Sequence, residues 1–213
     1  MDMLTKEAVR YLGYKNSDID ERTLELIKES FQELNRVVRK RWIYRIYDLN
    51  ETGNRLQFAN IETDSKNLHR NLEGCDQVIL FGATLGIETD FLMTRMAVLD
   101  MAKTVVMQAC ATALLEEFCD QCQEELAQEL KKENYYLRPR FSPGYGDFDI
   151  KYQENIMKAL DCAKKIGLTL TDSCMMSPKK SVTALIGISH MQRQCMKSGC
   201  EICKNKECNF RRS

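Results

Sequence analysis

The sequence lacks the features that would place it among disordered, membrane-spanning or nucleic-acid-binding proteins. Its 213 residues include only three prolines and 44% of them are hydrophobic, which is typical of a folded globular chain. The longest apolar run, VILFGATLGI, has ten residues, about half of what a membrane-spanning helix needs. Lysine plus arginine number 31, as do aspartate plus glutamate, so no net charge favours nucleic acid or an anionic membrane. We therefore expect a globular protein that binds neither.

Signals for export are also missing from the N-terminus. The stretch MDMLTKEAVRYLGYKN is charged and amphipathic, without the basic flank and apolar run of a secretory signal. We expect a cytoplasmic protein. Because the cytoplasm keeps thiols reduced, the ten cysteines are predicted to be free thiols or metal ligands before disulfides.

Groups for nucleophilic or phosphate chemistry are scarce. Only two histidines occur, His69 and His190, and neither lies in a recognisable nucleophile context. The stretch FGATLG (81–86) follows an apolar run, but it has neither Gly-x-Gly-x-x-Gly nor Gly-Lys-Ser/Thr, so a phosphate-binding loop is poorly supported. We predict no catalytic side chain.

The pattern of apolar residues predicts helices and strands in no regular alternation. Helices are predicted over 21–39, 65–73, 88–109, 111–133 and 151–165. Asp18 and Asp20 are placed to cap the first of these helices. Strands are predicted as a hairpin of 41–49 with 55–62, a buried strand over 77–86, and a second pair of 168–176 with 181–189. This mixture favours an α+β fold over a doubly wound sheet. We expect one domain over 1–190 and a basic, cysteine-rich tail over 191–213.

The loop RFSPGYGDF (140–148) combines a cation with backbone that a ligand can approach closely. Arg140 can hold a carboxylate through two parallel hydrogen bonds. Pro143 restricts the chain, Gly144 removes side-chain bulk, and Tyr145 offers a ring that can stack or donate. The alternative is a plain interhelical turn in which Tyr145 covers the core.

The helix predicted over 111–133 carries an acid at the margin of its apolar stripe. Glu116 lies about 100° from Leu115 on the helical wheel, while Glu117 and Asp120 point further outward. Glu116 is therefore the acid expected to be partly buried; the alternative is a solvated carboxylate on the flank. Cys119 and Cys122 fall on the stripe itself, which indicates buried, reduced thiols.

The tail contains four cysteines in the pattern Cys-x4-Cys-x2-Cys-x4-Cys. Four thiolates at this spacing can complete a tetrahedron around zinc, and an iron–sulfur cluster also accepts four cysteines. His190 could replace one thiol. Reduced, unligated thiols remain the alternative. The candidate metal ligands are Cys195, Cys200, Cys203 and Cys208.

Six stretches, taken in order, resemble the activation domain of cobalamin-dependent methionine synthase, and more closely its stand-alone bacterial form. The combination of Arg-x-x-Pro-Gly-Tyr with Ser-Pro-x-x-Ser-Val is fairly specific. The stretches are EAVRYLGYKN (7–16), CDQVILFGATLGIETDFLMTR (75–95), LLEEF (114–118), RFSPGYGDF (140–148), LTDSCMMSPKKSVTALIGIS (170–189) and the cysteine tail.

The resemblance implies both a fold and a function. The implied fold is a twisted antiparallel sheet with long flanking helices. Such domains bind S-adenosylmethionine and present its methyl group to cob(I)alamin, after an electron from a reduced flavodoxin or a similar donor has reduced the inactive cob(II)alamin. This chain has no Asp-x-His-x-x-Gly cobalamin motif. A cobalamin-binding methionine synthase or another corrinoid protein would therefore supply the cobalt.

The resemblance also assigns residues. Arg140 matches the arginine that holds the methionyl carboxylate of the ligand, and Glu116 matches the acid near the sulfonium. Pro143, Gly144 and Tyr145 match the loop beside that arginine. Two departures are visible: the loop ends Gly-Tyr-Gly where the family usually has Gly-Tyr-Pro, and SHMQRQCMK (189–197) has no counterpart of a tyrosine pair.

A second hypothesis comes from a different class of protein. The chain would be a non-catalytic, metal-binding adaptor of a corrinoid methyltransferase system. Its tail would bind zinc, its acidic helix over 116–133 would dock a partner, and the arginine loop would have lost its ligand. Binding of S-adenosylmethionine distinguishes the activation role from the adaptor role.

Overall fold

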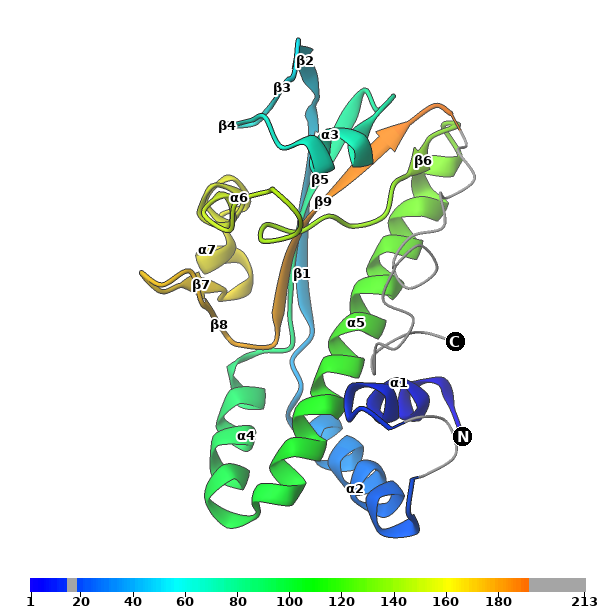
Figure 1. The fold of residues 1–213 in the computed structure, drawn as a ribbon, viewed down its shortest axis with the longest axis vertical. Coiled ribbons are helices and arrows are strands. Elements are labelled where there is room, and N and C mark those ends of the chain that lie inside the picture. The colour runs from blue at the N-terminus through cyan, green and yellow to red at the C-terminus, as the bar shows by residue number, and fades with distance from the viewer. Residues whose placement is uncertain (15–18, 192–213) are drawn as a thin grey trace.

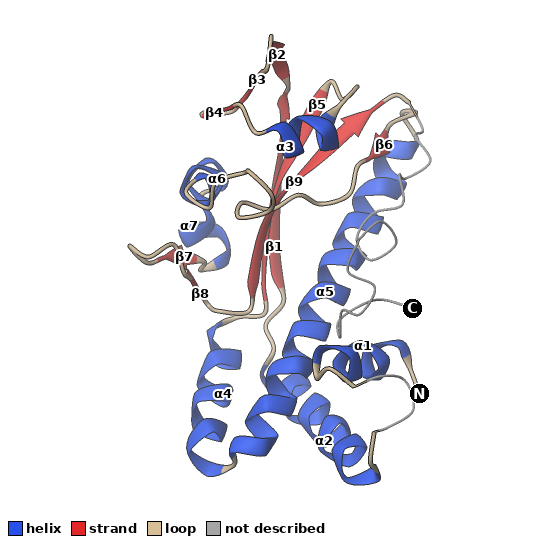
Figure 2. Ribbon diagram, viewed as in Figure 1, coloured by secondary structure: helices blue, strands red, loops and turns tan. Residues whose placement is uncertain are grey.

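The computed structural model describes residues 1–14 and 19–191 of the 213. Figures 1 and 2 show helices and strands mixed along this part of the chain. The helices are α1 (Met3–Tyr11), α2 (Glu21–Val37), α3 (Lys66–Leu72), α4 (Ile87–Leu99), α5 (Met101–Lys131), α6 (Tyr152–Leu160) and α7 (Cys162–Ile166). The strands are β1 (Arg41–Asp48), β2 (Asn50–Thr52), β3 (Arg55–Phe58), β4 (Ile61–Thr63), β5 (Gln77–Thr84), β6 (Tyr136–Leu137), β7 (Thr169–Leu170), β8 (Met176–Ser177) and β9 (Ser181–Ser189).

A four-stranded antiparallel sheet in the order β1-β5-β9-β6 forms the centre of the protein. β5 and β9 lie inside this sheet and are buried along nearly their whole length. This position explains their continuous apolar sequences, because a strand covered on both faces has no polar side. The α+β prediction with an antiparallel sheet is confirmed, as is the buried strand predicted over 77–86.

The two faces of the sheet are covered by different elements (Figure 1). α5 covers one face, and α1, α2 and α4 pack against α5, so that these helices and the sheet bury a core that includes Phe81, Met107 and Leu126 (Figure 1). α3, α6, α7 and the small β2-β3-β4 sheet cover the other face, around Leu80 and Phe148. β6 lies at the open edge of the sheet and is only two residues long. After β6, the chain passes from the α5 face to the α6 face around this edge (Figure 1).

The strand pairing differs from both hairpins expected from the sequence. β1 pairs along its whole length with β5, from Arg41 opposite Thr84 to Asp48 opposite Gln77. A tight turn at residues 53–54, between the two stretches expected to pair, joins β2 to β3. Likewise, β9 pairs with β5 and β6, whereas the segment before it forms only the two-residue pairing of β7 with β8. The physical reason is that an apolar central strand must be paired on both edges, which local alternation does not reveal.

Several helix boundaries also differ from the expected ones. The helices expected over 88–109 and 111–133 are instead α4 and a 31-residue α5, and Asp100 ends one and begins the other. Its side chain accepts a hydrogen bond from the Lys103 amide (3.0 Å), which is an N-terminal cap. The helix expected over 151–165 is divided at Asp161, whose φ is +55°. Asp20 caps α2 as predicted, and Asp18 lies outside the described residues.

Candidate functional site

One face of α5 brings three polar side chains towards the open edge of the sheet. Glu116, Asp120 and Gln123 follow one another at intervals of four and three residues, so they lie along the same side of the helix. Glu116 is partly buried, as predicted, with its side chain 36% exposed, whereas that of Asp120 is 64% exposed. The helical wheel points Asp120 outward, and Gln123 is not among the predicted site residues. Asp120 and Gln123 follow Glu116 by four and seven residues, and this helical spacing is the sequence signal that places all three on one side of α5.

Arg140 meets these three side chains from the loop that follows β6. Its Nη2 lies 2.6 Å from Asp120 Oδ1 and 3.3 Å from Glu116 Oε2, and its Nη1 donates to Gln123 Oε1 at 3.0 Å. The Arg140 side chain is only 18% exposed. Burial acts to lower the pKa of this guanidinium. The hydrogen bond and charge of Asp120, together with the charge of Glu116, outweigh burial and raise the pKa above its ordinary value, so Arg140 stays charged.

The backbone on either side of Arg140 is fixed by pairing with β9. The Arg138 amide donates to Gly187 O at 2.8 Å, and Phe141 and Leu185 exchange hydrogen bonds of 2.9 and 2.8 Å. Gln123 Nε2 also donates to Arg138 O at 3.3 Å, which ties α5 to the loop. The position of the guanidinium is therefore set by the sheet and by α5 rather than by the loop alone.

α1 forms a further wall beside the acids of α5. Tyr11 packs against the α5 core, and burial raises the pKa of its phenol, with the negative charge of Glu116 adding to the effect. Arg10 lies 4.2 Å from the centre of the Tyr11 ring and bonds Glu7 at 2.6 Å. Tyr11 was not among the predicted site residues, although it belongs to the EAVRYLGYKN stretch.

The remaining predicted loop residues lie further along, past the sheet edge. Pro143 is buried, and Tyr145 is 59% exposed with its ring edge-on to Phe141 (6.1 Å between centroids). Gly144 has φ +90° and donates its amide to Phe148 O at 2.7 Å. The structure thus brings Glu116 and Arg140 into contact, while no hydrogen bond links Pro143, Gly144 or Tyr145 to either of them.

Asp147 attaches the far end of the loop to α3. Its carboxylate accepts hydrogen bonds from the Ser65 hydroxyl and from the amides of Lys66 (2.8 Å) and Asn67 (3.1 Å). The Ser65 bond is the main cause that lowers the pKa of Asp147 to about 2, and the two amides add to it. Because these amides belong to the first turn of α3, the acid also complements the helix dipole.

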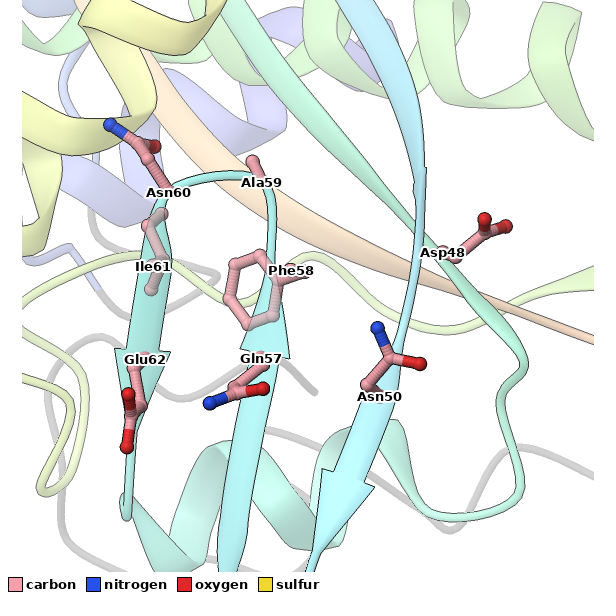
Figure 3. Close-up of a pocket in the computed structure, with 8 residues that line it drawn as sticks. All are labelled: Asp48, Asn50, Gln57, Phe58, Ala59, Asn60, Ile61 and Glu62. Atoms are coloured by element: carbon pink, nitrogen blue, oxygen red, sulfur yellow. The ribbon is translucent and has the colours of Figure 1, made fainter.

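Two further groups of residues do not join this site. A hollow of about 340 Å³ lies at the β2-β3-β4 sheet and contains none of the predicted site residues. Its lining includes Asp48, Asn50, Gln57 and Glu62, which Figure 3 draws. Cys119 and Cys122 are buried, unpaired thiols, as predicted. Burial raises their pKa to about 12 and about 11.

The metal prediction rests on residues that the structure does not describe. Within residues 1–14 and 19–191, no group of three or more histidine, cysteine, aspartate or glutamate side chains is arranged to hold a metal ion. The four candidate ligands Cys195, Cys200, Cys203 and Cys208 lie outside the described residues, so their metal binding stays a prediction. In the same described part, every helix is too short or too polar to cross a membrane.

Comparison with known protein families identifies the family of this chain. Residues 68–199 match the model of the vitamin B12-dependent methionine synthase activation domain, which covers more than half of the chain. The chain belongs to this family. A search of curated proteins gives no match. Among solved structures, the crystal structure of the MetH reactivation domain bound to AdoHcy has a TM-score of 0.60 at 19% identity, covering 89% of this chain and 77% of that one. At this identity, the likeness shows the fold.

In this activation domain, the Gly-Tyr-Gly ending of the loop has a local structural cause. Gly146 has φ +56°, which a proline cannot adopt. A Cβ at this position would also lie 2.5 Å from Asn67 Nδ2 of α3. The glycine is therefore required by the close approach of the loop to α3, next to the Asp147 attachment.

Proposed function

We propose that this chain binds S-adenosylmethionine beside Arg140 and Glu116 and presents its methyl group to the cobalamin of a partner protein. The single observation that carries the proposal is the 3.3 Å contact between Arg140 and Glu116, two residues 24 positions apart that the family resemblance assigns to the same ligand. Family membership supports the activation role. The matched MetH reactivation domain is the AdoHcy-bound form, which supports a ligand of the same chemistry here.

The charges of the site fit the two charged ends of this ligand. Arg140 is a fixed, largely buried cation and suits the ligand carboxylate, for which it can offer a bidentate pair of donors. Glu116 is a partly exposed carboxylate that can face the ammonium or the sulfonium. Asp120 now occupies one guanidinium nitrogen, and its exposed side chain is free to rotate away when a ligand carboxylate arrives.

The chemistry requires positioning rather than a side-chain nucleophile. An electron from a reduced flavodoxin or a similar donor converts cob(II)alamin on the partner to cob(I)alamin, which attacks the methyl carbon. The carbon–sulfur bond breaks, a carbon–cobalt bond forms, and S-adenosylhomocysteine leaves with the electron pair of the broken bond. The work of this chain is to hold the methyl group in line with the incoming cobalt. The corrinoid partner is a cobalamin-binding methionine synthase or a related protein.

Two measurements test the proposal. Isothermal titration calorimetry should show binding of S-adenosylmethionine to the purified chain. Mixing the chain with a cob(II)alamin protein, a low-potential reductant and S-adenosylmethionine should produce the visible spectrum of methylcobalamin, and omitting the chain should abolish it. No binding by calorimetry would overturn the ligand assignment, whereas binding without methylation would overturn the proposed partner or role.

A further inference from the structure

Among the described residues, exposed large apolar side chains gather on α4 and the start of α5. Of the thirteen large hydrophobic side chains that are exposed, six fall within this one helical hairpin. Large exposed apolar patches mark interaction sites on soluble proteins. The six are Ile87 (38% exposed), Phe91 (66%), Val98 (85%), Leu99 (65%), Met101 (68%) and Val105 (56%).

α4 is oriented so that this surface must face outward. The helix packs against α2 and α5, and it turns Thr89 and Asp90 inward while Phe91 and Val98 point to solvent. A bond to a distant segment holds this orientation, because Asp90 Oδ2 accepts from the Lys179 amide at 2.8 Å. A helix whose outer side faced only water would favour polar side chains on that side and apolar side chains on the inner side.

The outer side chains of α4 have the spacing of a helix-pairing seam. Ile87, Phe91, Thr94 and Val98 follow one another at intervals of four, three and four residues, which is the heptad spacing of a coiled coil. We propose that α4 pairs with α4 of a second copy of this chain, in antiparallel orientation about a two-fold axis. This dimer does not depend on the proposed function, since no residue of the Arg140 site takes part.

Charge complementarity favours a second copy as the occupant. Glu88 and Arg95 each follow a seam residue directly and both are exposed, so they lie on one edge of the seam, seven residues apart. When two copies of α4 run in opposite directions along that edge, Glu88 of one copy comes near Arg95 of the other. The two-fold axis repeats the pair, so a self-complementary interface gains it twice.

The apolar area is adequate for a small homodimer. The proposed interface includes the start of α5 with Met101 and Val105 beside the α4 seam and Leu99. Together the six side chains are equivalent to roughly four fully exposed ones at ~60–120 Å² each, or about 250–450 Å² per copy. A two-fold interface counts this area twice, ~500–900 Å². Small stable interfaces bury ~1,200 Å² in total, about 65% of it apolar in homodimers. The patch and its polar rim therefore reach the lower end of the stable range.

Sedimentation velocity on the full chain from ~1 to ~100 μM tests the dimer. We expect a concentration-dependent shift from monomer to dimer, and about thirtyfold weaker association for Phe91→Glu. Because Phe91 is already 66% exposed, this variant should keep the circular dichroism spectrum of the folded protein. Met175→Glu, at a 63% exposed apolar side chain in the turn between β7 and β8, is the matched control and should associate like the parent. A parent chain that stays monomeric at ~100 μM overturns the proposal.

A charge exchange tests the antiparallel register. Arg95→Glu alone should weaken association about fivefold, because it places two acids together at both symmetric pairs. Adding Glu88→Arg should restore it, because the pair is then re-formed with its signs exchanged. Failure of the double variant to restore the dimer overturns the antiparallel arrangement. Binding of a corrinoid protein by a monomer, abolished by Phe91→Glu, would assign the patch to that partner and overturn self-association.

Discussion

Asp120 and Arg140 are predicted to change ligand binding in opposite directions. In the structure, Asp120 occupies the guanidinium nitrogen that a ligand carboxylate would use, at 2.6 Å, and it is also the more exposed of the two acids. A ligand that binds Arg140 must first displace it. Asp120→Asn removes the competing charge and should strengthen binding, whereas Arg140→Ala removes the attraction itself.

The two effects differ in size as well as in sign. An ion pair as exposed as that of Asp120 contributes about 0.2–1 kcal/mol, so its loss should tighten binding of S-adenosylmethionine roughly 1.5- to 5-fold. A charge-assisted hydrogen bond contributes about 1.5–3 kcal/mol, so Arg140→Ala should weaken binding roughly ten- to a hundredfold. The Arg140 variant also leaves Glu116 without its cation, which adds repulsion towards a carboxylate.

Calorimetric titration of both variants with S-adenosylmethionine measures these changes. Glu125→Gln is the matched control, because it removes a carboxylate from an exposed position on the same helix without touching Arg140. Its affinity should equal that of the parent chain. If Asp120→Asn weakens binding, Asp120 contacts the ligand and the displacement argument is wrong. If Arg140→Ala binds as well as the parent, the carboxylate lies elsewhere.

Three further predictions concern stability and reactivity. Asp147→Ala should lower the melting temperature at pH 7. Because the pKa of the Asp147 carboxyl falls from 3.8 to about 2 on folding, its stabilisation is complete above about pH 4. Thermal melts of the parent and the variant should therefore converge as the pH falls through about 2. Gly146→Ala should lower the free energy of unfolding, measured in urea, by about 1–3 kcal/mol. Gly53→Ala is the control and should cost less, because Gly53 has a similar φ of +63° but open space around it. Equal costs would contradict the collision with α3. Iodoacetamide at pH 8 should leave four buried thiols intact in the folded protein while labelling the partly exposed Cys174, and mass spectrometry that finds equal labelling would contradict their burial. The protected thiols are Cys110, Cys119, Cys122 and Cys162, whose pKa values burial raises to about 12, 12, 11 and 12.

The sequence predicted those features that depend on local pattern and missed those set by distant neighbours. Three-four spacing identified α2, and the continuous apolar run identified β5, because both patterns follow directly from burial. The partner of β1 could not be found this way, since β5 lies 29 or more residues further along the chain. The same limit applied at the site. The wheel placed Glu116 correctly, but only the fold shows that Arg140 reaches Asp120 and Gln123.

The loop that presents Arg140 also closes the open side of the central sheet. β6 pairs with β9 over only two residues, and the Phe141–Leu185 bridge continues that pairing. If this segment were loosened to admit ligands more easily, the main-chain donors and acceptors of β9 would be uncovered and free to recruit strands from other molecules. Selection for a more accessible site would therefore conflict with resistance to aggregation, and engineering of this loop should monitor solubility as closely as affinity.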